Sequence, residues 1–217
     1  ETLGTERNVA RDAVLERAGA LSRARQEAAM RLGTTVTDAM QALGMVGGRF
    51  AVEVSTREGD KIGATGLDEV AFQVSANPGQ PLQSLTKVAS GGELSRISLA
   101  IQVATAEVGI IPTLVFDEVD VGIGGGIAEI VGRLLRRLGN ARQVLCVTHL
   151  PQVAAQAHQQ LRVQKQAVAG QTYTEIQPLA TEQRVDEIAR MLGGTEITAT
   201  TRAHAAEMLT GASGSDA

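Results

Sequence analysis

Two short apolar runs, separated by a segment with helical spacing, constrain the fold of this chain more than any other feature. Residues 113–116 (Thr-Leu-Val-Phe) and 144–147 (Val-Leu-Cys-Val) have the composition of strands that are covered on both faces of a parallel sheet. Residues 126–138, between them, repeat apolar side chains at helical spacing. Strand, helix and strand form a βαβ unit, so we expect an α/β fold with a mainly parallel sheet and flanking helices.

Charged side chains follow both predicted strands. Asp117 and Glu118 come directly after the first strand, and His149 comes two residues after the second. Ligands bind at the carboxyl ends of parallel strands, where one carboxylate can hold Mg²⁺, directly or through water, and its neighbour can activate a water that attacks a γ-phosphate. Taken alone, an Asp-Glu pair more often caps a helix or lies in a solvated turn, and a single histidine is more often a surface or capping residue.

A third signal precedes a helix predicted over residues 93–108. Ser90, Gly91 and Gly92 would present backbone N–H groups and a hydroxyl to an anion at the mouth of this helix, although the same residues suit a flexible turn with a serine N-cap. The phosphate-binding pattern G-x-x-x-x-G-K-[ST] does not occur in the sequence. Its nearest candidate, residues 122–126, has no following lysine.

The first 43 residues contain neither proline nor an aromatic residue. Apolar residues there follow the alternating four-and-three spacing of a heptad seam, at Val14, Ala18, Leu21, Ala28 and Leu32. We expect one arm of an antiparallel helical pair over residues 1–44; the alternative is an ordinary amphipathic helix that packs on its own domain. Because the chain begins at Glu1 in mid-helix pattern, we expect it to be a portion of a longer polypeptide.

Other patterns complete a globular lobe over residues 45–210. Alternating apolar and polar residues predict two hairpins, from residues 50–54 with 70–74 and from residues 161–168 with 172–176. A turn is predicted at residues 77–79, and helical spacing predicts closing helices over residues 182–192 and 196–209. Residues 211–217 have the composition of a mobile tail.

Composition narrows the classes of function. The net charge of −4 gives no general basic field for nucleic acid, and the 2% aromatic content argues against base-stacking platforms. The single cysteine, Cys146, is consistent with a reducing compartment and has the position of a buried small hydrophobe. No apolar run reaches the roughly 18 residues of a membrane span, and no signal peptide is recognisable, so we expect a cytoplasmic protein without a membrane partner.

Three segments resemble motifs of the SMC-like branch of the ABC ATPases. Residues 88–96 (Val-Ala-Ser-Gly-Gly-Glu-Leu-Ser-Arg) resemble the signature motif, and residues 114–122 (Leu-Val-Phe-Asp-Glu-Val-Asp-Val-Gly) resemble the Walker B strand and its loop. Residues 146–154 (Cys-Val-Thr-His-Leu-Pro-Gln-Val-Ala) extend the match beyond the switch histidine. With Asn-Pro-Gly at 77–79, the likeness is greatest to bacterial DNA-repair members of this family. It implies the carboxyl-terminal lobe of an ABC/SMC-type ATPase head, preceded by the returning coiled-coil arm.

The resemblance also implies roles for individual residues. Asp117 would be associated with Mg²⁺, Glu118 would be the general base and His149 would contact the γ-phosphate. The signature residues would bind ATP held by the opposing head: Ser90, Gly91, Gly92 and Glu93. Many members have an aspartate seven residues after the first acidic residue, where this chain has Gly124. The dimer-crossing role of that loop would pass to Asp120 or be weaker here.

The implied function is half of an ATP-dependent head in double-strand-break repair and recombination, in the bacterial cytoplasm at the nucleoid. ATP and Mg²⁺ are the implied cofactors; a second head, DNA and an amino-terminal lobe with the Walker A lysine and a Mg²⁺-contacting glutamine are the implied partners. This chain alone is expected to be inactive. Two alternatives are an ABC transporter nucleotide-binding subunit, which needs a membrane-docking helical subdomain before its signature, and a non-hydrolysing dimerisation module, against which Glu118 argues.

Overall fold

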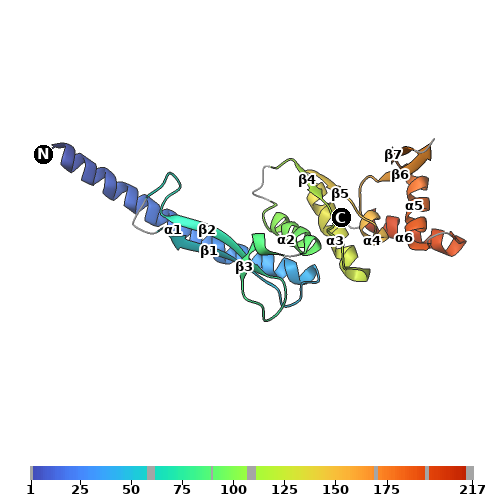
Figure 1. Ribbon diagram of the computed structural model, residues 1–217, viewed down its shortest axis with the longest axis horizontal. Helices are drawn as coiled ribbons and strands as arrows, with labels where there is room; N and C mark the ends of the chain where they lie inside the picture. Colours follow the sequence, from blue (N-terminus) through green and yellow to red (C-terminus); the bar gives the residue numbers. More distant parts are fainter. Residues whose placement is uncertain are drawn as a thin grey trace. The chain divides into compact units, whose positions relative to one another are not determined.

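The computed structural model describes residues 2–57, 62–88, 90–106, 111–168, 171–193 and 196–213. The chain forms two compact units, Glu1–Ser90 and Gly91–Ala217, which are described in turn (Figure 1). The first sheet packs along the first helix, so both belong to the first unit. In the part of the chain that the structure describes, no helix combines the length and the apolar character needed to cross a membrane.

The first unit begins with one long helix, α1 (Thr2–Ala42), in agreement with the predicted helical arm. Its carboxyl-terminal half buries Val36 and Met40 completely, whereas Val14 and Leu21 of the predicted seam remain 45% and 42% exposed. An apolar seam that is exposed in this way suits pairing with a second helix. The coiled-coil pairing itself stays a prediction.

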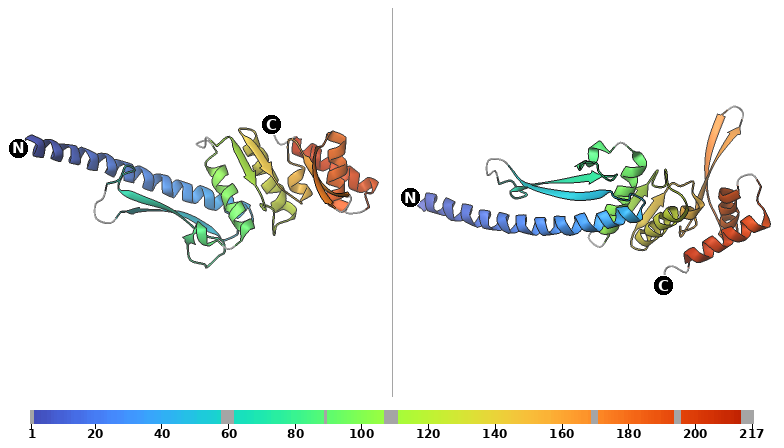
Figure 2. Two further views of the ribbon diagram at one scale, coloured as in Figure 1. Left: turned by 45° about the horizontal axis from the view of Figure 1, so that its top comes forward. Right: turned by 90° about the horizontal axis from the view of Figure 1, so that it is seen from below.

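An antiparallel sheet packs along α1. Strands β1 (Arg49–Thr56) and β2 (Asp68–Ser75) pair in a register that sets Phe50 opposite Val74, and this is the first predicted hairpin. The short strand β3 (Gln83–Ser84) and the 3₁₀ helix η2 (Leu85–Lys87) follow. Both views of Figure 2 show the β1–β2 ribbon alongside α1, where Phe50 and Val74 are buried.

The turn between α1 and β1 requires glycine at one position. Gly47 has a φ of 79°, and a Cβ there would lie 2.8 Å from the Cβ of Pro78. The side chain of Gln41 closes the turn, because its Oε1 accepts the N–H of Gly47 at 2.7 Å and its Nε2 donates to the carbonyl oxygen of Gly48 at 2.8 Å. Pro78 belongs to the predicted turn at residues 77–79, which is also present.

Asp68 fastens the start of β2 to α1. Its carboxylate is buried and accepts hydrogen bonds from the Ser22 hydroxyl at 2.8 Å and from the Arg25 guanidinium at 3.0 Å. The hydrogen bond from Ser22, followed by that from Arg25, holds the pKa of Asp68 below its ordinary value. The ionised carboxylate therefore stabilises this end of the sheet.

The second unit contains the predicted βαβ arrangement. Helix α2 (Gly91–Ala104) precedes strand β4 (Thr113–Phe116), helix α3 (Gly125–Gly139) and strand β5 (Gln143–Cys146). The two strands pair in parallel, as predicted, with Phe116 opposite Cys146. Leu114 and Phe116 are buried on one face of this pair, together with the apolar side of α3, whereas Val115, Leu145 and Val147 are exposed.

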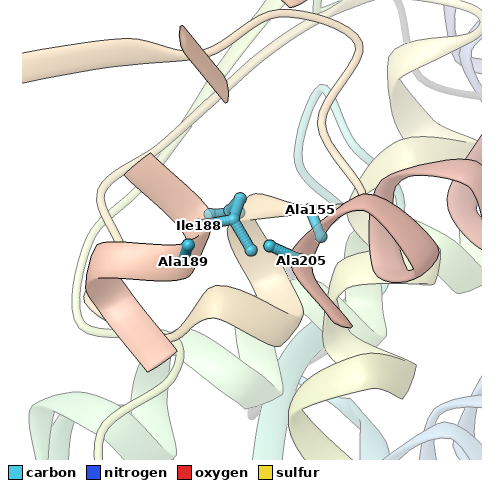
Figure 3. Packing of buried hydrophobic residues seen from close by; sticks show 5 residues of the cluster. Ala155, Ile188, Ala189 and Ala205 are labelled. Atoms are coloured by element: carbon cyan, nitrogen blue, oxygen red, sulfur yellow. The ribbon is translucent and has the colours of Figure 1, made fainter. Parts of the chain in front are cut away.

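The buried core of the rest of the second unit consists mainly of alanine side chains. This part of the chain comprises the four-residue helix α4 (Pro151–Ala154), the antiparallel hairpin β6 (Leu161–Val168) and β7 (Gln171–Pro178), and the helices α5 (Thr181–Gly193) and α6 (Ala199–Ser213). The second predicted hairpin is confirmed, although residue 170 at its turn lies outside the described residues. Figure 3 shows Ile188 of α5 among Ala155, Ala189 and Ala205, all of them buried.

Helix α6 continues beyond the predicted start of the tail at residue 211. Ala212 is only 2% exposed, and this burial explains why the helix includes it. Residues 214–217 lie outside the described residues. The elements that sequence patterns did not predict are β3, η2 and α4, which span two, three and four residues.

Asp68→Asn should lower the free energy of unfolding at neutral pH, because it removes the charge paired with Arg25. A depressed pKa means that the stabilisation is present above about pH 4 and is lost as the pH falls through the folded-state value. Urea unfolding from about pH 7 to about pH 3 should therefore give curves for the two proteins that converge at low pH. The matched variant Glu69→Gln replaces a side chain that is 70% exposed, so it should change the free energy of unfolding little. A difference in stability between the unmodified protein and Asp68→Asn that stays constant with pH would contradict the role of the Asp68 charge.

Ile188→Ala should destabilise the second unit by about 2–5 kcal/mol, because the small neighbouring side chains cannot fill the space that is vacated. Ile197→Ala removes the same atoms from a side chain that is 46% exposed, and should cost less than about 0.5 kcal/mol. Urea unfolding of both variants measures the difference. Equal losses would mean that the α5–α6 core contributes no more than the surface.

Candidate nucleotide-binding site

The predicted acidic pair lies at the carboxyl end of β4. Asp117 is exposed, and its Oδ1 accepts the backbone N–H of Glu118 at 2.9 Å. The Ser95 hydroxyl, on α2, donates to the carbonyl oxygen of Asp117 at 2.7 Å. The end of the strand is therefore fixed to the helix that begins in the signature-like motif.

Glu118 has an unusual backbone conformation. Its φ is 57°, and it is the one non-glycine residue with a positive φ among those that the structure describes. This left-handed conformation costs about 1–2 kcal/mol for a residue with a Cβ, and such strain is concentrated at functional sites. The carboxylate lies against the first turn of α2, because a Cβ added to Gly91 would meet Glu118 Oε2 at 2.5 Å.

The loop after Glu118 is also attached to α2. A Cβ on Gly92 would lie 3.2 Å from both the Cβ and the carbonyl oxygen of Val121, so the helix and the loop are in close contact and a larger residue would require the loop to shift by a few tenths of an ångström. Arg96 donates to the same carbonyl oxygen at 2.7 Å. Burial lowers the pKa of Arg96, with the nearby Glu93 acting in the opposite direction, and the guanidinium remains charged. The first two turns of α2 and the loop over residues 117–121 thus form one connected structure.

The candidate histidine reaches the same edge from β5. The N–H of Val147 donates to the carbonyl oxygen of Phe116 at 3.0 Å, which continues the parallel pairing to the ends of both strands. The side chain of His149 is 71% exposed, and its Nδ1 lies 3.5 Å from Oδ2 of Asp120. Asp120 is 2% exposed and also accepts the Thr148 hydroxyl and, at 3.2 Å, the N–H of His149.

The signature residues divide between the two units. Ser90 ends the first unit, while Gly91, Gly92 and Glu93 open α2 in the second. Within the second unit, the structure brings the first turn of α2 together with Glu118, and it brings Asp120 together with His149. The roles assigned to these residues stay predictions.

Three contributors were not recognised from sequence: Ser95, Arg96 and Thr148. All three lie inside the motif-like segments, and Thr148 stands between the predicted strand and the histidine. Cys146, in contrast, is half-buried, and burial, with the charges of Asp120 and Asp117, raises the pKa of its thiol to about 12. The thiol is therefore protonated at neutral pH, as expected for a small packing residue.

The donor set suits a metal ion that shares its ligands with phosphate. The described residues include no group of three or more His, Cys, Asp or Glu side chains that could enclose a metal. Mg²⁺ is usually bound by one or two carboxylates together with phosphate oxygens and water. An exposed Asp117 at a strand end fits this type of site.

The relatives of this chain in sequence include DNA repair proteins of two bacteria. No family model matches the chain. The DNA repair protein RecN of Vibrio cholerae is 50% identical over 207 residues, which cover 95% of this chain and 37% of that protein. RecN of Haemophilus influenzae is 52% identical over 192 residues, covering 88% of this chain and 34% of the relative. The chain thus spans about a third of the length of these relatives.

Solved structures give the fold. The SMC head domain of Pyrococcus furiosus with an extended coiled coil, bound to the C-terminal domain of ScpA, has a TM-score of 0.57 and 17% identity, over 87% of this chain and 45% of that one. The SMC head domain of Pyrococcus yayanosii has a TM-score of 0.53 and 18% identity, over 73% and 28% of the two chains. At these identities the likeness concerns the fold alone. The chain is therefore similar to the DNA repair protein RecN over nearly its whole length and has the fold of an SMC head domain.

Proposed function

We propose that this chain is the carboxyl-terminal part of an ATP-hydrolysing head in a RecN-type protein, in which ATP joins two heads and hydrolysis releases them, so that turnover controls the engagement of DNA during double-strand-break repair and recombination. One observation carries the proposal. The parallel pairing of β4 with β5 brings Asp117, Glu118 and His149 to one sheet edge, beside the first turn of α2. This is the edge at which α/β proteins bind ligands.

Asp117 and Glu118 would divide the chemistry between them. Asp117 would hold Mg²⁺, directly or through water, and the ion when bound would neutralise negative charge on the phosphates. Glu118 would orient a water molecule and accept its proton. The strained backbone of Glu118 supports this role, because it aims the carboxylate from a fixed strand end rather than from a mobile loop.

The mouth of α2 would serve the nucleotide of a second head. A helix of 14 residues carries partial positive charge at its amino end, and the glycine at its exposed first position adds no side chain there. Ser90, Gly91 and Gly92 would therefore contact the γ-phosphate in trans, Glu93 would belong to the same nucleotide-binding group, and His149 would contact the γ-phosphate within its own head. The attachment of α2 to the loop over residues 117–121 gives this contact a route to Glu118.

A complementary lobe is needed for both structure and chemistry. Parallel sheets normally have both faces covered, yet Val115, Leu145 and Val147 are 68%, 45% and 64% exposed on one face of β4–β5. We assign this face to an amino-terminal lobe of the same head, which would also supply the phosphate-binding loop and a Mg²⁺-contacting glutamine. The chain alone would then hydrolyse ATP negligibly. The complete protein would act in the cytoplasm, at the nucleoid.

The two alternatives receive less support. Similarity to RecN over nearly the whole chain favours DNA repair over transport. A carboxylate held at the strand end beside α2 favours turnover over a purely structural dimerisation module.

In the full-length protein, Glu118→Gln should slow ATP hydrolysis by roughly 10²–10⁴ and leave ATP binding intact, because the amide keeps the shape and cannot act as a base. ATP-bound dimers should then accumulate. Steady-state hydrolysis, equilibrium nucleotide binding and light scattering measure the three quantities.

The matched control for this experiment is Glu129→Gln. Glu129 is an exposed glutamate of α3 that pairs with Arg133, so its replacement should leave turnover unchanged. If Glu118→Gln hydrolysed ATP like this control, the assignment of Glu118 as the base would be wrong.

Ser90→Arg should prevent two heads from closing without weakening ATP binding to the same head. The reason is that the longer arginine side chain would fill the space required by the phosphate of the opposing head. Heads carrying this change should be inactive, as should heads in which the phosphate-loop lysine is replaced. A mixture should recover activity, since one composite site in each heterodimer is intact. Hydrolysis measured over a range of mixing ratios tests this, and absence of recovery in demonstrated heterodimers would refute action in trans.

A further inference from the structure

We propose that Asp120 is a positioning residue that holds His149 in the orientation needed to meet a phosphate. The inference rests on the proposed function, because it concerns how the head presents its histidine. It assigns Asp120 a role within its own head, in place of the dimer-crossing role that the family resemblance suggested.

Three contacts of this network converge on one carboxylate oxygen. Oδ2 of Asp120 accepts the hydroxyl of Thr148 and the backbone N–H of His149, and Nδ1 of the His149 ring lies 3.5 Å away. The Thr148 hydroxyl in turn accepts the N–H of Leu150 at 3.0 Å. Asp120 thereby fixes three successive residues between the end of β5 and the start of α4.

Burial makes these bonds obligatory. Asp120 is 2% exposed, and a buried carboxylate without hydrogen-bond donors is strongly destabilising. The donors come from the segment that directly follows β5, so their loss would release the segment that carries His149. A side chain this buried has little surface left for a second head, and this favours the role within its own head.

The side chain of His149 is exposed, whereas that of Asp120 is buried. The His149 side chain is 71% exposed, although its backbone N–H is held by a buried group. Because Nδ1 faces Asp120, Nε2 is the ring nitrogen left for a ligand. The backbone of His149 is therefore fixed while its Nε2 is accessible, which is the arrangement that a preorganised phosphate contact requires.

The first measurement uses nucleotide-free, full-length protein. Asp120→Ala and Thr148→Val should each accelerate hydrogen exchange of the peptide that contains the His149 amide by roughly tenfold, the effect of losing one net hydrogen bond. Asp120→Asn keeps an oxygen acceptor, and Thr148→Ser keeps the hydroxyl, so both should exchange more slowly than the corresponding disruptive variant. Thr210→Val, which removes a hydroxyl from α6, is the control for loss of a hydroxyl elsewhere. Unchanged exchange at His149 in both disruptive variants would overturn the inference.

The second measurement is a double-mutant cycle for ATP hydrolysis. With His149 present, Asp120→Ala and Thr148→Val should lower the maximal rate by about 10–100-fold with little change in nucleotide affinity. With His149→Ala, the same changes should have an effect at least about tenfold smaller, because the group that they position is already gone. Equal losses in both backgrounds would show that Asp120 acts elsewhere, and would overturn the inference.

Glu118→Gln is assayed in parallel, and its hydrolysis rate is the baseline for the cycle. It also separates the hypothesis that Glu118 is the base from the hypothesis that Asp120 positions His149. If Glu118→Gln hydrolyses ATP normally, the proposed chemistry fails, while the exchange measurement still reports whether Asp120 holds His149. If Glu118→Gln is inactive and exchange at His149 is unaffected by the Asp120 variants, the proposed function stands and the positioning role is wrong. Where Asp120→Ala does not fold, Thr148→Val provides the same two readouts through the smaller perturbation.

Discussion

Parallel pairing of β4 with β5 is the constraint on which the rest of the candidate site depends. Because the strands run in the same direction, their carboxyl ends coincide, and residues about 30 positions apart in the sequence meet at one edge. A shift of this register would separate Asp120 from Thr148 and would turn the apolar side chains of β4 away from α3. The register is therefore the structural basis of both the proposed chemistry and the proposed positioning of His149.

The second contribution comes from α2, which does more than present glycines to an anion. Ser95 and Arg96 bond to backbone carbonyl groups on either side of Glu118, at Asp117 and Val121. Backbone atoms are fixed points, so these bonds restrain the loop without depending on any other side chain. The start of α2 and the backbone on both sides of Glu118 are therefore joined by two hydrogen bonds.

Sequence patterns were sufficient for those features that local chemistry determines. The apolar runs before Asp117 and His149 predicted the two parallel strands, although one face of the pair is exposed, and alternation at Phe50 and Val74 was sufficient to predict the first hairpin. The contact of Asp120 with Thr148 could not be predicted in this way, since it depends on the pairing of distant strands. The positive φ of Glu118 was equally hidden, because sequence rules expect this conformation at glycine, as at Gly122 and Gly125. The extent of α6 depended on the burial of Ala212, which no local pattern reveals.

The open face of β4–β5 has a consequence for how such a protein behaves in solution. A parallel pair of strands with exposed Val115, Leu145 and Val147 offers an apolar surface, and in the described part of the chain each strand also has an unpaired edge. Exposed edges of this kind promote strand addition between molecules. Left uncovered at high concentration, this surface would recruit other copies and lower solubility. The concentration at which the protein self-associates therefore reports whether another surface covers this face of β4–β5.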